Sequence, residues 1–379
     1  MADIKLQIQA VPHQRCACPV SVVVDEGTEG PFTVTDAITG KTAPGYCTVE
    51  DGTATLNWVI DRLGADEERA YQATPGASNS EGVVVDAVSD TQVNVSIGGI
   101  HFTTYHCGPE LARPYCYPLN DATGSCVTRA DVGEKPGETT DHEHHRSLWV
   151  AYGEANDTDN WSEQEGHGRT VHHRFETSGN DVFGQLTGYG DWVTVDGDPL
   201  LRESRRMRFY DVGDHPLRVL DVDLMLQAVN GDMHFGDTKE GGFLSVRVAT
   251  TMDATGDGRI ENSFGGVSEA ECWGKRANWC DYSGPVDGHW SGIAVMEHPD
   301  TFRSPTYWHV RNYGLMSTNP FGVGAFHSNP NLSGAYTLPD GEDLSFSYRV
   351  VIHSGTAQKA CIADHYMQYI NPPQVKVLG

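Results

Sequence analysis

The chain has 379 residues, and its 52 acidic side chains against 26 Lys and Arg give a formal net charge of −26. This balance argues against nucleic acid or an anionic membrane surface as the main partner, because both bind basic surfaces. No apolar run approaches the roughly 18 residues that cross a bilayer, and the chain does not start with a basic stretch followed by an apolar segment. We therefore expect a cytoplasmic protein.

Short segments of alternating polarity, separated by Gly and Pro, predict strands along most of the chain. Residues 56–63 fit a helix or a strand equally well. Residues 83–104 indicate two or three strands joined by turns at Ser89-Asp90 and Gly98-Gly99. Further strands are predicted at residues 202–210, 219–226, 243–250 and 344–352. Near the end of the chain, residues 357–369 predict a helix that is closed by two prolines.

Many short strands with frequent turn signals are typical of an all-β sandwich or barrel. We expect one domain over residues 1–379, with a soft internal boundary near 97–101. That boundary would separate an N-terminal β region (1–97) from a region that bears the site (98–379). The cysteines number nine, an odd count, and without an export signal they are predicted to be reduced thiols.

The densest group of titratable residues is the run DHEHHRSLW at 141–149. On an extended chain, His142 and His144 would face one way, and Glu143 and His145 the other. Two imidazoles spaced in this way can chelate a metal, with His142 and His144 as ligands, or can donate protons and hydrogen bonds to a sugar. A surface loop rich in histidine is the alternative, and the sequence places no third metal ligand.

A second group is the run DTKEGGF at 237–243. The two glycines allow a tight loop that opens a strand and approaches a ligand closely. Glu240 is a candidate general base, with Lys239 holding it ionised or binding an oxyanion. The alternative is a solvated hairpin with an exposed ion pair.

A third group lies at residues 305–314, with the sequence PTYWHVRNYG. Alternation places His309 and Arg311 on one face, with Tyr307 and Tyr313 in phase. Such a row suits a sugar or a carboxylate, through stacking and bidentate hydrogen bonds. A polar outer sheet face is the alternative, and a turn at residues 319–322 follows.

Several of these segments, taken in order, resemble a bacterial family that carries the label "methane oxygenase PmoA". The segments that carry the resemblance are RPYCYP at 113–118, VTR at 127–129, DHEHHRSLW at 141–149, Asn156, Trp161, DTKEG at 237–241, WGKR at 273–276, WCDYSG at 279–284 and residues 305–322. The label does not suit this chain, because a methane monooxygenase subunit is a membrane protein and no span is present. The resemblance implies a β-supersandwich similar to galactose mutarotases and a role in carbohydrate catabolism.

We therefore predict a large antiparallel β-supersandwich with a short C-terminal helix, and a carbohydrate-active enzyme. The expected reaction is lyase or hydrolase cleavage of a glycoside, with a keto-glycoside among the candidate substrates, by acid–base catalysis. The alternatives are a sugar epimerase or mutarotase and a non-catalytic carbohydrate-binding protein. The predicted partner is a small sugar or glycoside, a divalent metal ion is a possible cofactor, and the sequence leaves the oligomeric state open.

The predicted roles require the three groups to meet in one hollow. The predicted catalytic residues are His144, His145, Glu240 and His309. The predicted substrate-binding residues are Tyr117, Arg129, Arg146, Trp161, Lys239, Arg311 and Asn319.

Overall fold

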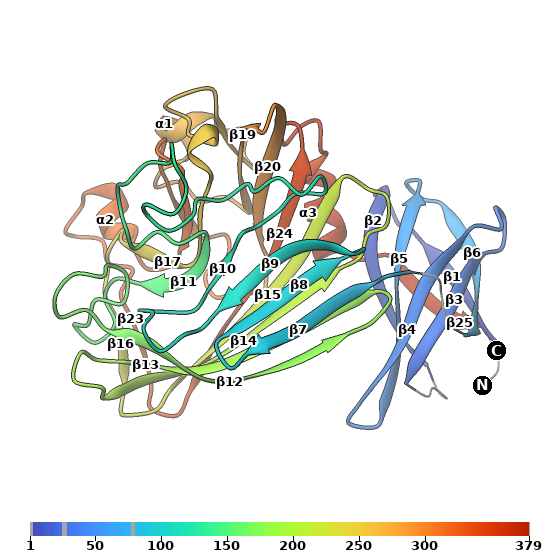
Figure 1. Ribbon diagram of the computed structural model, residues 1–379, viewed down its shortest axis with the longest axis horizontal. Helices are drawn as coiled ribbons and strands as arrows, with labels where there is room; N and C mark the ends of the chain where they lie inside the picture. The colour runs from blue at the N-terminus through green and yellow to red at the C-terminus, as the bar shows by residue number, and fades with distance from the viewer. Residues whose placement is uncertain (1–2, 25–28, 77–79, 379) are drawn as a thin grey trace.

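The protein, seen here as a computed structural model, is described over residues 3–24, 29–76 and 80–378. Its strands form three antiparallel sheets of seven, eight and eight strands, with a short two-stranded ribbon (Figure 1). The predicted all-β class is confirmed. Among the described residues, no helix has the length and apolar character needed to cross a membrane.

The seven-stranded sheet forms the N-terminal end of the molecule and contains its own apolar core (Figure 1). Its strands, in spatial order, are β2 (Arg15–Val24), β5 (Thr53–Leu63), β4 (Thr42–Glu50), β3 (Gly30–Asp36), β6 (Glu68–Pro75), β1 (Ile4–Gln9) and β25 (Gln374–Leu378). Residues 56–63 are therefore a strand. Leu56, Trp58 and Ile60 enter the core of this sheet, while Val59 packs on the opposite face, so a strand buries both sides of the segment.

The two eight-stranded sheets pack face to face around the main core. The first sheet contains β21 (Tyr307–Val310), β22 (Leu315–Asn319), β17 (Gly241–Arg247), β11 (Leu148–Tyr152), β10 (Tyr115–Tyr117), β9 (Ile100–His106), β8 (Gln92–Ile97) and β7 (Val83–Ser89). The second contains β12 (Arg169–Gly179), β13 (Phe183–Val193), β14 (Pro199–Tyr210), β15 (Leu217–Ala228), β24 (Asp343–Ser354), β20 (His289–Glu297), β19 (Trp279–Val286) and β18 (Arg259–Asn262). Contacts such as Phe102 with Phe209, and Phe243 with Phe346, join the two sheets.

Strand β15 shows why the alternation in the sequence predicts this sandwich. Leu220, Val222 and Leu224 enter the main core. On the opposite face, Asp221 accepts two hydrogen bonds from Arg349 of the neighbouring strand, at 2.6 and 2.8 Å. The alternation of apolar and polar residues therefore indicates that one face of the strand is buried in the core and that the other carries paired charges.

The remaining elements are short. They are η1 (Thr250–Met252), α1 (Ser268–Cys272), α2 (Val323–His327), α3 (Ile362–Ile370) and the ribbon of β16 (Met233–Phe235) and β23 (Tyr336–Leu338). The predicted C-terminal helix is confirmed as α3, although it begins at Ile362 rather than at 357. It packs between the second sheet of the sandwich and the N-terminal sheet. The chain then returns to the N-terminal sheet, where β25 pairs with β1.

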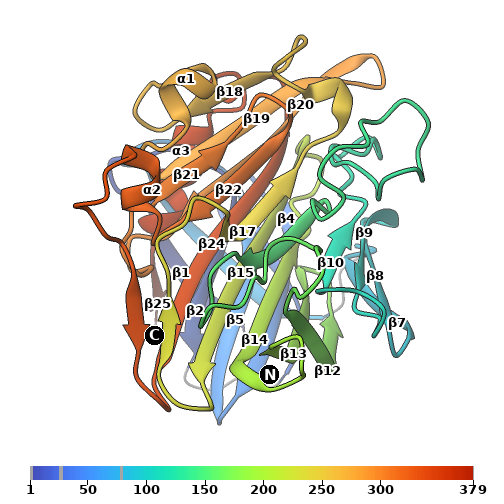
Figure 2. The ribbon, with the colours of Figure 1, turned by 90° about the vertical axis from the view of Figure 1, so that its left-hand side faces the viewer.

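The predicted turns at Ser89-Asp90 and Gly98-Gly99 join β7 to β8 and β8 to β9. The first six strands of the N-terminal sheet end at Pro75, before β25 returns to it, and residues 97–101 lie within the first sheet of the sandwich. Figure 2 shows the molecule from the end at which β10, β17 and β22 meet the long connections between strands; β11 is labelled in Figure 1. The candidate site is built from these connections.

Candidate functional site

The histidine run at 141–149 forms a turn that leads into β11, and not an extended strand. His142 adopts a left-handed backbone conformation with φ of 48°, and the His145 amide donates to the His142 carbonyl at 3.0 Å. The predicted alternation of His142 and His144 against His145 is therefore wrong. Because of the turn, the three imidazole rings lie together, with centroids 4.4 to 5.8 Å apart.

Two buried arginines from distant parts of the chain hold this turn. Arg129 donates to the carbonyls of Asp141, His142 and His145 at 2.7, 2.8 and 3.2 Å. Arg247, which is fully buried on β17, binds both carboxylate oxygens of Asp141 at 2.9 and 3.0 Å. Arg129 is only 1% exposed. It lies beneath the turn and supports the histidines from behind.

The rings form a continuous stack. Tyr313 lies parallel to His142 at 4.7 Å, His142 to His145 at 4.8 Å, and His145 to Trp149 at 5.4 Å. His144 and Trp161 meet this stack with their edges. Such contacts fix the plane of each imidazole, so the histidines are held in defined orientations.

The tautomer of His145 follows from its partner. A guanidinium can only donate hydrogen bonds, and Arg247 lies 3.1 Å from Nδ1 of His145, so this nitrogen must be the acceptor. Burial, reinforced by the charges of neighbouring His and Arg side chains, lowers the pKa of His145 well below its usual value. The ring is therefore neutral at neutral pH and carries its proton on Nε2.

His144 and Asp141 have opposite electrostatic environments. Burial is the largest effect on His144, and together with the charges of Arg113 and His142 it lowers the pKa to about 4. Burial alone would raise the pKa of Asp141, but the hydrogen bond with His142 and the charge of Arg247 outweigh it and lower that pKa. At neutral pH, His144 is thus an uncharged base and Asp141 a carboxylate.

The loop that carries Lys239 and Glu240 forms the opposite wall, and it opens β17 as predicted. Asn319 holds this loop: its amide donates to the carbonyls of Thr238 and Gly241 at 2.9 and 2.7 Å. Gly242 permits the close approach of β22, because a Cβ atom there would lie 0.8 Å from the Thr318 carbonyl oxygen. Asn319 is completely buried, so it positions the loop from below.

The ion pair of Lys239 and Glu240 lies at the surface of this loop. The two side chains are 43% and 44% exposed, and the Lys239 ammonium contacts a carboxylate oxygen of Glu240. The Glu240 carbonyl accepts a hydrogen bond from the Gly153 amide at 3.0 Å. This bond links the loop to the end of β11.

A third wall carries Trp161. The Asp159 carboxylate accepts hydrogen bonds from the amides of Trp161 and Ser162 at 2.8 and 2.9 Å, and so fixes the turn that presents the indole. Next to it, Arg146 binds Glu163 through two nitrogens and Asp131 through a third. All three donor groups of Arg146 are thereby engaged with carboxylates.

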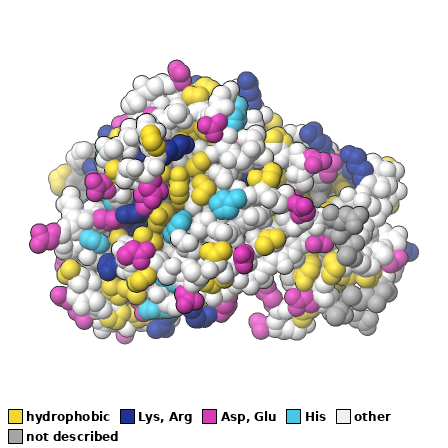
Figure 3. Space-filling model, viewed as in Figure 1, with side chains coloured by type: hydrophobic (Ala, Val, Ile, Leu, Met, Phe, Trp, Pro, Cys, Tyr) yellow, Lys and Arg dark blue, Asp and Glu magenta, His cyan; other side chains and the backbone are white. Residues whose placement is uncertain are grey.

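These walls enclose an open hollow of about 600 Å³. Its lining is formed by His142, His144, Gly153, Glu154, Asp157, Asp159, Trp161, Ser162, Gln164, Thr238 and Glu240. Among the residues that the structure describes, the lining contains four carboxylates and neither Lys nor Arg. Acidic side chains are also spread over the whole face of the molecule shown in Figure 3. The hollow therefore suits a neutral or cationic ligand better than an anionic one.

The structure unites two of the three predicted groups in this hollow and leaves the third at its side. His309 on β21 is 2% exposed and does not line the hollow. Burial lowers its pKa to about 4, and the charge of Glu240 acts in the opposite direction. Arg311 turns away to bind Glu269 at 3.0 Å, and Tyr313 of the same segment stacks on His142.

Neither Tyr117 nor the predicted metal pair of His142 and His144 has its predicted place in the structure. Tyr117 packs beside the cluster of Tyr115, Trp149 and Trp161 and does not line the hollow. Nδ1 of His142 lies 2.5 Å from Asp141, and the rings of His142 and His144 meet edge to face. Within the described ranges, no group of three or more His, Cys, Asp and Glu could hold a metal ion. The predicted His142–His144 metal site is not supported.

Several residues of the site carry no signal in the sequence. Glu154, Asp157 and Asp159 lie in an irregular connection after β11, where no periodic pattern marks them. Arg247 lies inside a predicted strand, and only its pairing with Asp141 reveals its role. A buried arginine is seldom unpaired, so a lone Arg in an apolar strand is the one signal that could have found it.

The sequence of the chain matches one known protein family. Residues 92–367, almost three quarters of its length, match the model of a family of unknown function, DUF6807. The chain belongs to this family. Its description carries no methane oxygenase label, so the label implied by the sequence resemblance is not supported. No curated protein matches the chain.

Two solved structures from Enterococcus faecalis are distantly similar to this DUF6807 protein. One is a protein in the glycosyl hydrolase family 38, with a TM-score of 0.46 and 7% identity. The other is an alpha-mannosidase from strain V583, with a TM-score of 0.48 and 8% identity. Both alignments cover all of this chain, which spans 47% and 46% of those two structures.

Proposed function

We propose that this protein is a carbohydrate-active enzyme that cleaves a glycoside in the hollow between His144, Trp161 and Glu240. The observation that carries the proposal is that a neutral histidine, a carboxylate and an indole from three separate segments line one open hollow. An indole face suits the apolar face of a sugar ring, and the polar groups around it suit hydroxyls.

The electrostatics assign His144 the role of a base, which elimination and base-assisted hydrolysis both need, and we propose elimination. With a pKa of about 4, His144 is unprotonated at neutral pH and can accept a proton. In a keto-glycoside, the carbonyl group acidifies the adjacent C–H bond, and this is the proton that His144 would remove. His144 takes this proton, the electron pair forms a double bond and expels the glycosidic oxygen, and the imidazolium returns the proton to that oxygen.

The other residues around the hollow hold the reacting groups in place. The Glu240 carboxylate is an acceptor for a sugar hydroxyl, and the ammonium of Lys239, which does not line the hollow, pairs with that carboxylate. Arg129, Arg247 and Asn319 act as positioning residues, because their donors bind protein groups. His145 presents the proton on Nε2 and serves as a neutral donor. In this scheme His144 is the base, whereas the sequence analysis assigned proton abstraction to Glu240 and proton donation or relay to His144 and His145.

The test compares turnover of His144→Ala and Glu240→Gln with that of two control variants. His173→Ala and Glu176→Gln alter exposed side chains on β12, outside the hollow. The substrates are neutral glycosides and the corresponding keto-glycosides, and NMR identifies the products. We expect His144→Ala to lose about 100-fold or more in kcat, the size of a general acid–base contribution. Glu240→Gln, which loses an acceptor for a sugar hydroxyl, should lose about tenfold in kcat/KM, while the controls keep wild-type rates. Full turnover by both site variants would rule out the proposal.

The same experiment separates the two alternatives. A His and a Glu that line one hollow could also exchange protons during anomer interconversion, so NMR of free aldoses tests for a mutarotase. Anomer exchange without bond cleavage would replace the proposed reaction. A sugar that binds near Trp161 and is recovered unchanged would identify a binding protein.

A further inference from the structure

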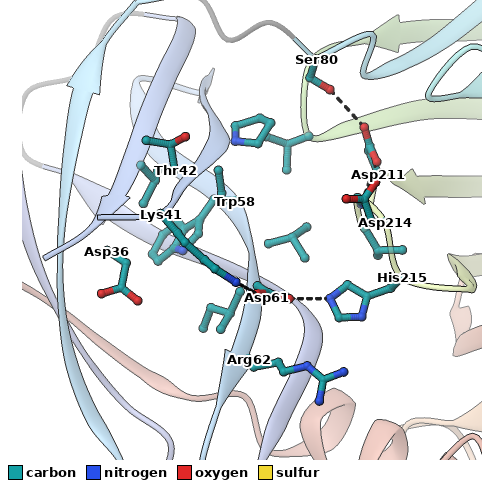
Figure 4. A pocket seen from close by; sticks show the side chains of 18 of the residues that line it. Asp36, Lys41, Thr42, Trp58, Asp61, Arg62, Ser80, Asp211, Asp214 and His215 are labelled. Atoms are coloured by element: carbon teal, nitrogen blue, oxygen red, sulfur yellow. Dashed lines mark hydrogen bonds and ion pairs between the residues drawn. The ribbon is translucent and has the colours of Figure 1, made fainter. Parts of the chain in front are cut away.

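A second hollow, of about 780 Å³, lies between the N-terminal sheet and the sandwich (Figure 4). One wall comes from β3 to β6 of the N-terminal sheet, and the other from the residues before β13 and the turn between β14 and β15. The indole nitrogen of Trp58 is buried there without a hydrogen-bond partner among the described residues. Lys41, Arg62 and Arg69 add cationic donors to the lining.

The side chains of a cysteine, a histidine and an aspartate are hydrogen-bonded in series at the edge of this hollow. Sγ of Cys16 lies 3.7 Å from Nδ1 of His215, and Nε2 of His215 lies 2.8 Å from Oδ1 of Asp61. Figure 4 shows the contact between His215 and Asp61. Cys16 and Asp61 come from the paired strands β2 and β5, whereas His215 comes from the β14–β15 turn. These two hydrogen bonds therefore connect the N-terminal sheet to the sandwich.

The partners determine where the imidazole proton lies. A carboxylate accepts hydrogen bonds, so Nε2 of His215 carries the proton that binds Asp61. The lone pair of the neutral ring is then on Nδ1, which faces the Cys16 thiol. Cys–His catalytic groups have the same order: a thiol nucleophile, a histidine base and a third group that orients the histidine.

Cys16 differs in this respect from the other cysteines. Across the described residues, no other cysteine sulfur has a histidine nitrogen within hydrogen-bond distance. Cys16 is partly exposed, and its register partner Arg62 lines the hollow. Burial raises the pKa of the thiol, and the charge of Arg62 opposes this effect. The thiol is therefore protonated at neutral pH and needs a base to react.

We propose that Cys16 is a nucleophilic thiol that accepts acyl groups from activated esters or thioesters, with His215 as its base. His215 takes the thiol proton as sulfur attacks the carbonyl carbon. The carbon–oxygen or carbon–sulfur bond to the leaving group breaks, and the leaving group takes the proton from the imidazolium. The products are S-acylated Cys16 and a free alcohol, phenol or thiol. Arg62, which is the register partner of Cys16 and lines the hollow, is the candidate donor for the carbonyl group of the acyl compound.

The experiment treats the folded full-length protein with limiting p-nitrophenyl acetate and maps the acetylated cysteines by peptide mass spectrometry. We expect Cys16 to be acetylated at least tenfold faster than Cys361, which is exposed and has no histidine partner. His215→Asn should slow acetylation of Cys16 about tenfold or more, and Asp61→Asn by a smaller factor, with no change at Cys361. Cys16→Ser provides the blank for the assignment.

Two results would overturn the proposal. One is acetylation of Cys361 as fast as that of Cys16, and the other is an unchanged Cys16 rate in His215→Asn. Because His215 joins two parts of the fold, each variant is first compared with wild type by its denaturant midpoint. Asp61 is 56% exposed, so Asp61→Asn keeps the test available if His215→Asn does not fold.

Discussion

Asn319 offers a sharp test of how the loop bearing Glu240 is held against β22. Its side chain makes four hydrogen bonds: two donated to the carbonyls of Thr238 and Gly241, and two accepted from the amides of Phe321 and Gly322 at 3.0 and 2.8 Å. A net contribution of about 1 kcal/mol per bond predicts that Asn319→Ala lowers the free energy of unfolding by about 4 kcal/mol.

The isosteric variant Asn319→Asp tests the same hydrogen bonds through the direction in which stability changes with pH. The two accepted bonds remain, but a carboxylate oxygen replaces the amide nitrogen 2.9 and 2.7 Å from two carbonyl oxygens. The repulsion raises the folded-state pKa of the new carboxyl above its unfolded value of about 3.9. The protonated form can donate one of the lost bonds. Stability relative to wild type is therefore highest below about pH 4 and falls as pH rises through the folded-state pKa.

Urea unfolding at a series of pH values measures this dependence, with Asn331→Asp as the control because Asn331 is exposed. At pH 7 we expect Asn319→Asp to lose about 3 kcal/mol, with about 1 kcal/mol regained in acid. We also expect a fall in kcat in the glycoside assay, because Glu240 loses its fixed position. If the two Asp variants show the same stability at every pH, the assigned role of Asn319 is refuted.

Three further predictions concern burial, packing and protonation. Burial raises the pKa of Glu297 to about 7, so the free-energy cost of burying the charged carboxylate is absent below its unfolded pKa and grows as pH rises. Glu297→Gln should therefore stabilise the protein by up to about 3 kcal/mol at pH 8 and hardly at about pH 4, as measured by urea unfolding. Gly242→Ala should destabilise by about 3 kcal/mol or prevent folding, whereas Gly256→Ala, whose Cβ would lie 3.5 Å from its nearest neighbour, should unfold like wild type. The kcat/KM of glycoside cleavage should rise with pH through about 4 and then stay level to neutrality, because His144 acts unprotonated; a rise centred near pH 6.5 would exclude His144 as the base.

Strands of the sandwich could be predicted where the alternation of apolar and polar residues in a segment matches its buried and exposed faces. The alternation in β15 and the paired turns of β7, β8 and β9 are local signals, and the structure contains these elements where they were expected. Strand β25 escaped prediction because it is short, mostly exposed and follows two prolines. Its identity depends on pairing with β1 at the other end of the chain.

The arrangement of the site depends on contacts that no local pattern contains. The run at 141–149 has the alternation of a strand, but Arg129 and Arg247 bind its carbonyls and Asp141 in a turn instead. The sequence separates His142 from Tyr313 and Glu240 by long stretches, yet they meet around the hollow. The sequence therefore predicted several residue types of the site. It did not predict the stack of aromatic rings or the acidic residues Glu154, Asp157 and Asp159 that line the hollow.

The central claim is that a sugar occupies the hollow between His144, Trp161 and Glu240. A crystal structure of the catalytically impaired His144→Ala variant, soaked with a neutral glycoside that the wild-type enzyme cleaves, tests it most directly. We predict a sugar ring against the Trp161 indole with a hydroxyl bound by Glu240. A glycoside found only in the second hollow beside Trp58 and His215, with the first one empty, would contradict the claim.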